Sequence, residues 1–234
     1  MSTNTPKPDY RHAFWLCAAL LAACTSTPPQ PNWQLSASGS SERFVAAYLE
    51  GNQRVEAAEF ARLQRELSAT GKVELLARAE LLRCATRIAS LVLEPCAGFE
   101  RLRQDAPVPE RAYADYLAGR LQPQDAALLP AQQRAAASGN ADAASLKTLA
   151  DPLSQLVAAG VLLQNGRASP AVVALAVDTA SGQGWRRPLL AWLGVQAALA
   201  EKAGDTQGAA QIKRRMDLTA LPAPTASPAT PAKP

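Results

Sequence analysis

Histidine is almost absent from the sequence: the single copy among 234 residues is His12, close to the first residue. Without histidine, a chain has no Ser-His-Asp or Cys-His pair and no imidazole ligand for a metal. The sequence also lacks a glycine-rich phosphate loop, paired C-x-x-C motifs and a G-x-S-x-G nucleophile turn. These absences predict a protein that is not an enzyme and that uses no metal and no cofactor.

Charge and aromatic residues are also scarce. The net charge is +4, and only 5% of the residues are aromatic. No basic run is interleaved with aromatic residues, so a nucleic-acid partner is not expected. With so few aromatic side chains, much of the core must come from close helix packing through alanine.

The sequence has no long hydrophobic run, and its most apolar stretch extends only from Ala13 to Ala23. A membrane-spanning helix needs about 20 residues. The stretch follows Lys7 and Arg11, a pattern typical of a secretory signal peptide. It ends in Leu21-Ala22-Ala23-Cys24, which resembles the lipobox of bacterial lipoproteins. The alternative is an N-terminal core helix that happens to end in cysteine.

The lipobox resemblance implies cleavage before Cys24 and attachment of three acyl chains to that cysteine. Two or more chains hold a protein stably at a membrane. Thr25 follows instead of the aspartate that commonly retains lipoproteins at the inner membrane, which favours the periplasmic face of the outer membrane. Cleavage would also remove His12 and lower the basic residues from 24 to 22 and the acidic residues from 20 to 19, a net charge of +3.

Two cysteines remain once the signal peptide is gone and Cys24 carries lipid: Cys84 and Cys96. Disulfides persist in the oxidising periplasm. Cys84 lies on the apolar face of a predicted helix, and Pro95 requires the chain to turn soon after it. We therefore predict a disulfide across this turn. Two buried free thiols or a redox pair are the alternatives.

Composition divides the chain into four segments. Residues 1–23 are the predicted signal peptide, and residues 24–40, rich in Pro, Ser and Thr, are predicted to be a lipid-anchored flexible tether. Residues 41–220 are predicted to form an α-helical domain, and residues 221–234, rich in Pro, Ala and Thr, are predicted to be a disordered tail. Trp33 in the tether is expected to dock on its own domain.

The middle segment predicts an all-α fold of antiparallel helical hairpins, because helix-forming residues dominate and alternating β-branched runs are missing. Residues 73–93 are apolar over more than half of the helix circumference, which predicts a central helix packed on two sides. Residues 122–140 have the weakest pattern. The predicted helices cover residues 41–51, 53–68, 73–93, 97–104, 108–119, 152–164, 170–181, 188–203 and 205–218.

Glutamates near arginines are predicted to be ordinary helix-surface residues. Along residues 73–93, Glu74 is expected to pair with Arg78 and Glu80 with Arg83, at the spacing of neighbours on one helix face. The other glutamates assigned to solvated helix faces are Glu50, Glu56, Glu59 and Glu66.

Four glycines, Gly51, Gly119, Gly166 and Gly204, each precede alanine by a few residues. The pattern Gly204-Asp205-x-x-x-Ala209 is similar to a turn in tetratricopeptide repeats, in which glycine ends one helix and aspartate caps the next. The glycines are 68, 47 and 38 residues apart, and only the first separation is twice the repeat length of about 34. A degenerate tetratricopeptide-like array and simple helical hairpins with glycine turns both remain open.

These observations predict an outer-membrane-anchored periplasmic lipoprotein that acts as a non-catalytic adaptor or accessory factor in envelope assembly or secretion. Its expected partners are the membrane, through the lipid, and an envelope protein or peptide; the sequence assigns no partner-binding residues. A carboxylate-dependent cell-wall hydrolase, which needs two carboxylates flanking a sugar bond, is one alternative. A binder of an apolar cargo is the other.

Overall fold

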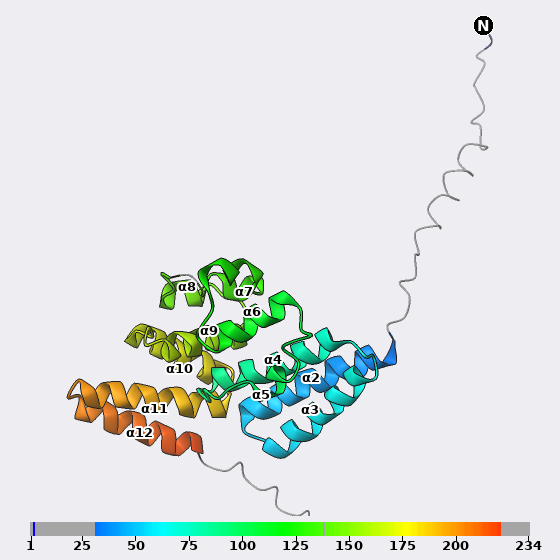
Figure 1. Ribbon diagram of the computed structural model, residues 1–234. Helices are drawn as coiled ribbons and strands as arrows, with labels where there is room; N and C mark the ends of the chain where they lie inside the picture. Colours follow the sequence, from blue (N-terminus) through cyan, green and yellow to red (C-terminus); the bar gives the residue numbers. More distant parts are fainter. Residues whose placement is uncertain (1, 3–30, 138, 221–234) are drawn as a thin grey trace, which may run out of the picture. The chain divides into compact units, whose positions relative to one another are not determined.

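The computed structural model describes residues 2, 31–137 and 139–220. Every regular element in this part of the chain is a helix (Figure 1), which confirms the predicted all-α fold. The helices are α2 (Asn32–Glu50), α3 (Gln53–Ser68), α4 (Val73–Ala89), α5 (Ala97–Glu100), α6 (Val108–Leu117), the 3₁₀ helix η1 (Pro123–Leu128), α7 (Ala131–Arg134), α8 (Ala143–Lys147), α9 (Pro152–Gln164), α10 (Pro170–Gly182), α11 (Arg186–Lys202) and α12 (Thr206–Ala220).

Helix α2 begins well before the predicted boundary of the domain. It starts at Asn32, so residues 32–40 belong to the helix and not to a flexible tether, and the prediction is wrong there. The serines of this segment are poor helix formers, but tertiary contacts outweigh that preference. Ala37 and Ser40 are buried, and Trp33 packs against a cluster that includes Phe44 and Phe60, as expected for docking on its own domain.

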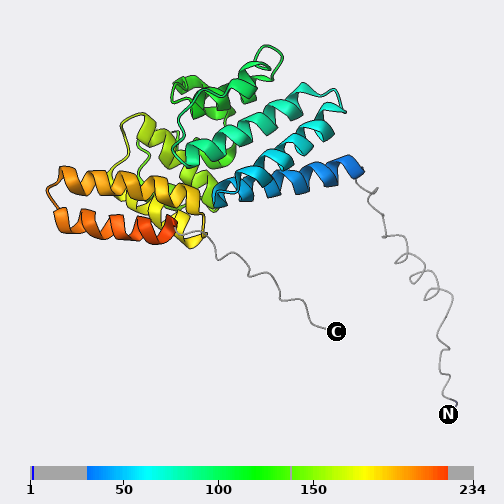
Figure 2. The same ribbon diagram turned by 90° about the horizontal axis from the view of Figure 1, so that it is seen from below.

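Helix α4 is the central helix that its two-sided apolar pattern predicted. One side, including Ala77 and Leu81, belongs to the main core, and Ala79 belongs to a smaller cluster shared with α2 and α3. Figures 1 and 2 show α2, α3 and α4 side by side. The helix ends at Ala89, earlier than the predicted Leu93, because the chain turns at Leu91 with a φ of 59°.

Glycine turns join consecutive helices that pack as antiparallel hairpins. Gly51, Gly166 and Gly204 all have positive φ and lie between α2 and α3, α9 and α10, and α11 and α12. The backbone N–H of Gly208 donates to Asp205 Oδ1 at 2.8 Å, so the predicted aspartate cap forms at the start of α12. Figures 1 and 2 show α11 and α12 lying side by side.

Two helices begin at the predicted Asp-Pro and Ser-Pro pairs. Asp151 and Ser169 each accept a hydrogen bond from a backbone N–H in the first turn of α9 and α10, and a proline follows each of them. Residues 122–140, where the sequence pattern was weakest, hold only the short helices η1 and α7.

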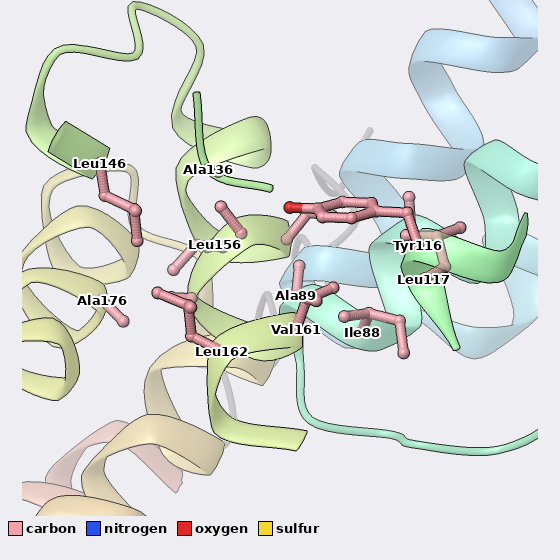
Figure 3. Packing of buried hydrophobic residues seen from close by; sticks show 14 of the residues in the cluster. Ile88, Ala89, Tyr116, Leu117, Ala136, Leu146, Leu156, Val161, Leu162 and Ala176 are labelled. Carbon is pink, nitrogen blue, oxygen red and sulfur yellow. The ribbon is translucent and has the colours of Figure 1, made fainter. Parts of the chain in front are cut away.

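The main core contains small residues in the close-packed arrangement expected from the scarcity of aromatic residues. Alanines such as Ala89, Ala136 and Ala176 lie among leucine and valine side chains (Figure 3). A buried polar pair crosses this core: the Tyr116 hydroxyl donates to Gln133 Oε1 at 2.7 Å. Gln133 in turn donates to a backbone carbonyl of α9, so both groups are satisfied, as burial requires.

Candidate functional site

The predicted lipid-bearing residue, Cys24, and the rest of Leu21-Ala22-Ala23-Cys24 lie outside the described residues, as does the predicted tail 221–234. Lipidation at Cys24 therefore stays a prediction. Among the helices that are described, none has the length and hydropathy that crossing a membrane requires.

The other two predicted site residues are brought together. Cys84 of α4 and Cys96, just before α5, form a disulfide, with their Cα atoms 5.8 Å apart. The bond ties the segment after α4 back onto that helix. Cys84 and Cys96 are both partly buried against the main core, a position consistent with a structural role.

Arg78 does not form the ion pair expected along α4. Its Nε lies 2.7 Å from Oε1 of Glu110 in α6, so the pair joins two helices and does not involve Glu74. Glu110 is only 7% exposed. A carboxylate that is buried to this extent needs a charged partner, and the packing of α6 against α4 places Arg78 within reach.

Arg83 likewise pairs across helices. Its Nε donates to Glu56 Oε1 of α3 at 3.0 Å, and its guanidinium lies 4.4 Å from the centre of the Phe60 ring. Glu80, the expected partner, accepts a hydrogen bond from Gln64 at 2.8 Å. Glu56 and Glu80 are both buried, so their assignment to solvated helix faces is wrong.

The buried carboxylates are therefore engaged in structural contacts between helices. Each of Glu56, Glu80 and Glu110 has its own hydrogen-bond donor on a neighbouring helix. In the described part of the chain, no three Asp, Glu, Cys or His side chains gather closely enough to hold a metal ion.

A cavity of about 480 Å³ opens where α4, α6, η1 and α7 meet. Its walls are mainly apolar, and the lining includes Leu81, Leu82, Tyr113, Leu128, Leu129 and Pro130. Ligand sites of proteins usually have volumes of about 300–1,000 Å³ and apolar walls with a few polar groups. By size and chemistry, this cavity is the candidate functional site.

Local sequence places these side chains around the cavity. Arg78, Leu81 and Leu82 are three and four residues apart on α4, so they share one face of that helix. In α6, Pro109 occupies the first turn, where it needs no hydrogen-bond donor, and Tyr113 follows one turn later.

The cavity has buried apolar residues at its floor and exposed apolar residues at or beside its mouth. Leu81 and Leu129 are only 2% and 1% exposed. Leu128 at the mouth is 36% exposed, and Val108, next to the lining residue Pro109, is 52% exposed. Large apolar side chains exposed beside a concave apolar surface are typical of a binding site.

The polar groups of the cavity are two arginines, one carboxylate and one phenol. Glu110 Oε1 accepts the hydrogen bond from Arg78, whereas Oε2 is buried with no hydrogen-bond partner among the described residues. Arg134 donates its Nε to the carbonyl of Leu129 at 2.9 Å. Burial raises the pKa of the Tyr113 hydroxyl above its ordinary value, and the Asp151 carboxylate adds to this effect, so the shift disfavours a phenolate in the cavity.

A second apolar cavity, of about 340 Å³, lies on the other side of Leu82. Its lining includes Val45 and Leu49 of α2 and Trp185, which precedes α11. Leu82 of α4 is the residue that the two linings share.

Sequence reasoning left the partner-binding residues unassigned, and the reason is physical. The lining of the main cavity comes from helices far apart in the chain, and no single stretch carries a motif. The available signal was weak: Val108-Pro109 and Leu128-Leu129-Pro130 place apolar residues at helix ends and turns, where polar residues are more common.

Comparisons with known proteins add no functional information. The chain matches no protein-family model, no curated protein and no solved structure. The tetratricopeptide-like interpretation of the hairpins accordingly stays a prediction, and the function has to be argued from the residues themselves.

Proposed function

We propose that this protein is an outer-membrane-anchored periplasmic lipoprotein that acts as a non-catalytic adaptor or accessory factor in envelope assembly or secretion. The proposal combines the lipobox-like Leu21-Ala22-Ala23-Cys24 with a helical domain that carries an apolar cavity. The single observation that carries it is a cavity with a buried apolar floor, one of whose apolar lining residues, Leu128, is 36% exposed.

The chemistry of the cavity favours binding over catalysis. Its one carboxylate, Glu110, is held by Arg78 at 2.7 Å, and burial raises the pKa of the Tyr113 phenol further above its ordinary value, which disfavours its ionisation. A hydrolase acting through carboxylates needs two of them, one protonated and one ionised, on opposite sides of the scissile bond. Glu110 is the only carboxylate that lines the cavity, within the residues that the structure describes.

Binding of an apolar cargo is a second candidate, favoured by the same apolar walls and by the neighbouring cavity across Leu82. Extraction of lipid from the purified protein, followed by mass spectrometry, tests it. A stoichiometric lipid in addition to the anchor would support the cargo-binding function, and none would count against it.

Metabolic labelling with palmitate tests the membrane anchor. The protein should incorporate the label and lose its original N-terminal methionine, whereas Cys24→Ala should remain unlabelled. Cys17→Ala is the matched control and should label normally. An unlabelled protein that still begins with Met1 would contradict the anchor.

Site-specific photocrosslinking in intact cells tests the adaptor function. A photoreactive amino acid is placed at Val108, which is exposed and directly precedes the lining residue Pro109. The same amino acid at Leu218, which is 71% exposed on α12, is the control. We expect one defined envelope protein to crosslink at Val108 and not at Leu218. If the two positions give the same crosslinks, the cavity is not the partner site.

A further inference from the structure

Two arginines at the main cavity are held in the same way, each by its Nε atom. Arg78 donates Nε to Glu110 Oε1 at 2.7 Å, and Arg134 donates Nε to the Leu129 carbonyl at 2.9 Å. Neither arginine uses its Nη atoms in a hydrogen bond to any described residue, and the side chain of Arg78 is 64% exposed. The Nη donors of both guanidinium groups therefore remain available at the edge of the cavity.

The charge balance of the lining favours an anion. Glu110 already neutralises Arg78, so Arg134 is the charge in the lining that has no acidic partner among the described residues. The planar guanidinium group binds carboxylates with two parallel hydrogen bonds. A carboxylate at this edge would thus meet donors that are already positioned by their Nε contacts.

Each of the two arginines adjoins a buried leucine of the cavity lining. Leu129, whose carbonyl holds Arg134, is itself 1% exposed and lines the floor, and Leu81 lies one turn after Arg78 on α4. A ligand that satisfies both parts of the site must join an apolar group to a carboxylate over a short distance.

We infer that the cavity binds a peptide segment of a protein partner in which an apolar side chain lies next to a carboxylate. The side chain fills the space between Leu81 and Leu129, and the carboxylate accepts hydrogen bonds from the Nη atoms of Arg134 and Arg78. This inference rests on the proposed adaptor function and names the chemistry of its partner. A peptide with a basic residue at this position would be repelled.

The test is photolabelling of the purified lipid-bearing protein in liposomes, without detergent because detergent would enter an apolar cavity. The probe is N-acetyl-p-benzoylphenylalanine, which has an apolar photoreactive side chain next to a carboxylate. Its amide, which is neutral, is the matched control. Labelled residues are mapped by mass spectrometry after proteolysis.

The carboxylate probe should label residues that line the cavity, with a preference over the amide of about tenfold, the usual effect of one charge-assisted hydrogen bond. Arg134→Gln should lower this preference several-fold, because only Arg78, which Glu110 neutralises, would remain. Arg214→Gln, a change of an exposed arginine on α12, should leave the preference unchanged. Equal labelling by the two probes would overturn the inference, as would a preference that Arg134→Gln leaves unchanged.

A second variant tests the same inference in case Arg134→Gln does not fold. Val108→Asp adds a carboxylate directly before the lining residue Pro109, in the first turn of α6, where a negative charge suits the helix dipole. Its carboxylate should compete for the arginines and weaken labelling by the acidic probe several-fold. Unchanged labelling in Val108→Asp would contradict the inference.

Competition separates the possible sources of the carboxylate. An excess of N-acetylphenylalanine should block labelling, and octanoate should block it less well. If octanoate blocks labelling more strongly, the ligand is a fatty acid and the inferred peptide is wrong.

The in-cell crosslinking and the photolabelling can fail separately. Crosslinking at Val108 in cells together with failed labelling by the acidic probe would overturn the inferred chemistry and leave the adaptor function standing. Failure of the in-cell crosslinking would instead count against the adaptor function.

Discussion

Gly160 of α9 lies directly against the backbone of α4 at Ile88. A Cβ atom built on Gly160 would come within 2.5 Å of the Ile88 carbonyl oxygen and 2.8 Å of its Cγ2 atom. Because a backbone carbonyl in a buried helix cannot move aside, glycine is required for the two helices to approach this closely. This crossing joins the central helix to the hairpins that follow.

Gly160→Ala should therefore destabilise the protein. Overpacking of a well-packed interface costs about 1–3 kcal/mol. Urea unfolding, followed by circular dichroism, would measure the loss in the free energy of unfolding. Gly182→Ala is the matched control, because Gly182 is also in a helix but has nothing within 4 Å of its would-be Cβ; it should be neutral or slightly stabilising. Equal effects of the two changes would contradict the close approach.

The disulfide between Cys84 and Cys96 should contribute measurably to stability. The two residues are 12 apart in the sequence, and closing a loop of this length stabilises the folded state by about 3 kcal/mol in the chain-entropy model. Thermal unfolding of the double variant Cys84→Ser/Cys96→Ser should show this loss. The wild-type protein with a reducing agent should unfold like the variant; if the reductant changes nothing, the bond is not formed in solution.

Glu56→Gln should also weaken the fold, since it leaves Arg83 without its charged partner between α3 and α4. The Glu56 side chain is only 9% exposed, and hydrogen bonds to charged groups are worth about 1.5–3 kcal/mol. Denaturant unfolding measures the effect. Glu50→Gln, on the exposed end of α2, should change the free energy of unfolding little. A Glu56 variant as stable as the wild type would show that the pair contributes nothing net.

Glu100 predicts part of the pH dependence of stability. A hydrogen bond from Arg103 Nε at 2.6 Å lowers the pKa of the Glu100 carboxyl below its ordinary value of 4.5. The folded state therefore holds this proton less tightly than the unfolded state does. The resulting stability is complete above the unfolded pKa and is lost as the pH falls through the folded pKa.

The comparison of wild type with Glu100→Gln by urea unfolding measures this contribution. The wild type should be more stable at neutral pH, and the difference should disappear in acid, below the lowered pKa. The effect should be small, because the Glu100 side chain is 42% exposed and solvent screens the pair. A difference that is the same in acid and at neutral pH would show that the charge of Glu100 is not its cause.

Helix ends and turns that depend on residues a few positions apart could be predicted from the sequence. Asp151 and Ser169 start their helices because a side-chain oxygen and the following proline act within one turn. Gly204 and Asp205 end one helix and cap the next for the same local reason. The Cys84–Cys96 pair was also within reach, since only one short turn separates the two residues.

Leu91 shows where local signals fail. The N–H groups of Leu91 and Val92 donate to the carbonyls of Ile88 and Arg87, the pattern of a helix end that usually has glycine in the left-handed position. Leucine gives no such signal in a sequence, so the helix was expected to continue to Leu93. Packing of Leu91 against the main core holds the unfavourable conformation.

The amino-acid sequence by itself determined that this chain forms helices, where most of them begin and end, and which two cysteines meet, because hydrogen-bond caps, turns and periodicity act over a few residues. It also carries the lipobox-like motif from which the cellular location is inferred. Only the tertiary structure decided that α2 extends back to Asn32, that Arg78 pairs with Glu110, and that an apolar cavity opens between α4 and α6. These features arise from side chains distant in the chain, whose contacts exist only after the helices have packed.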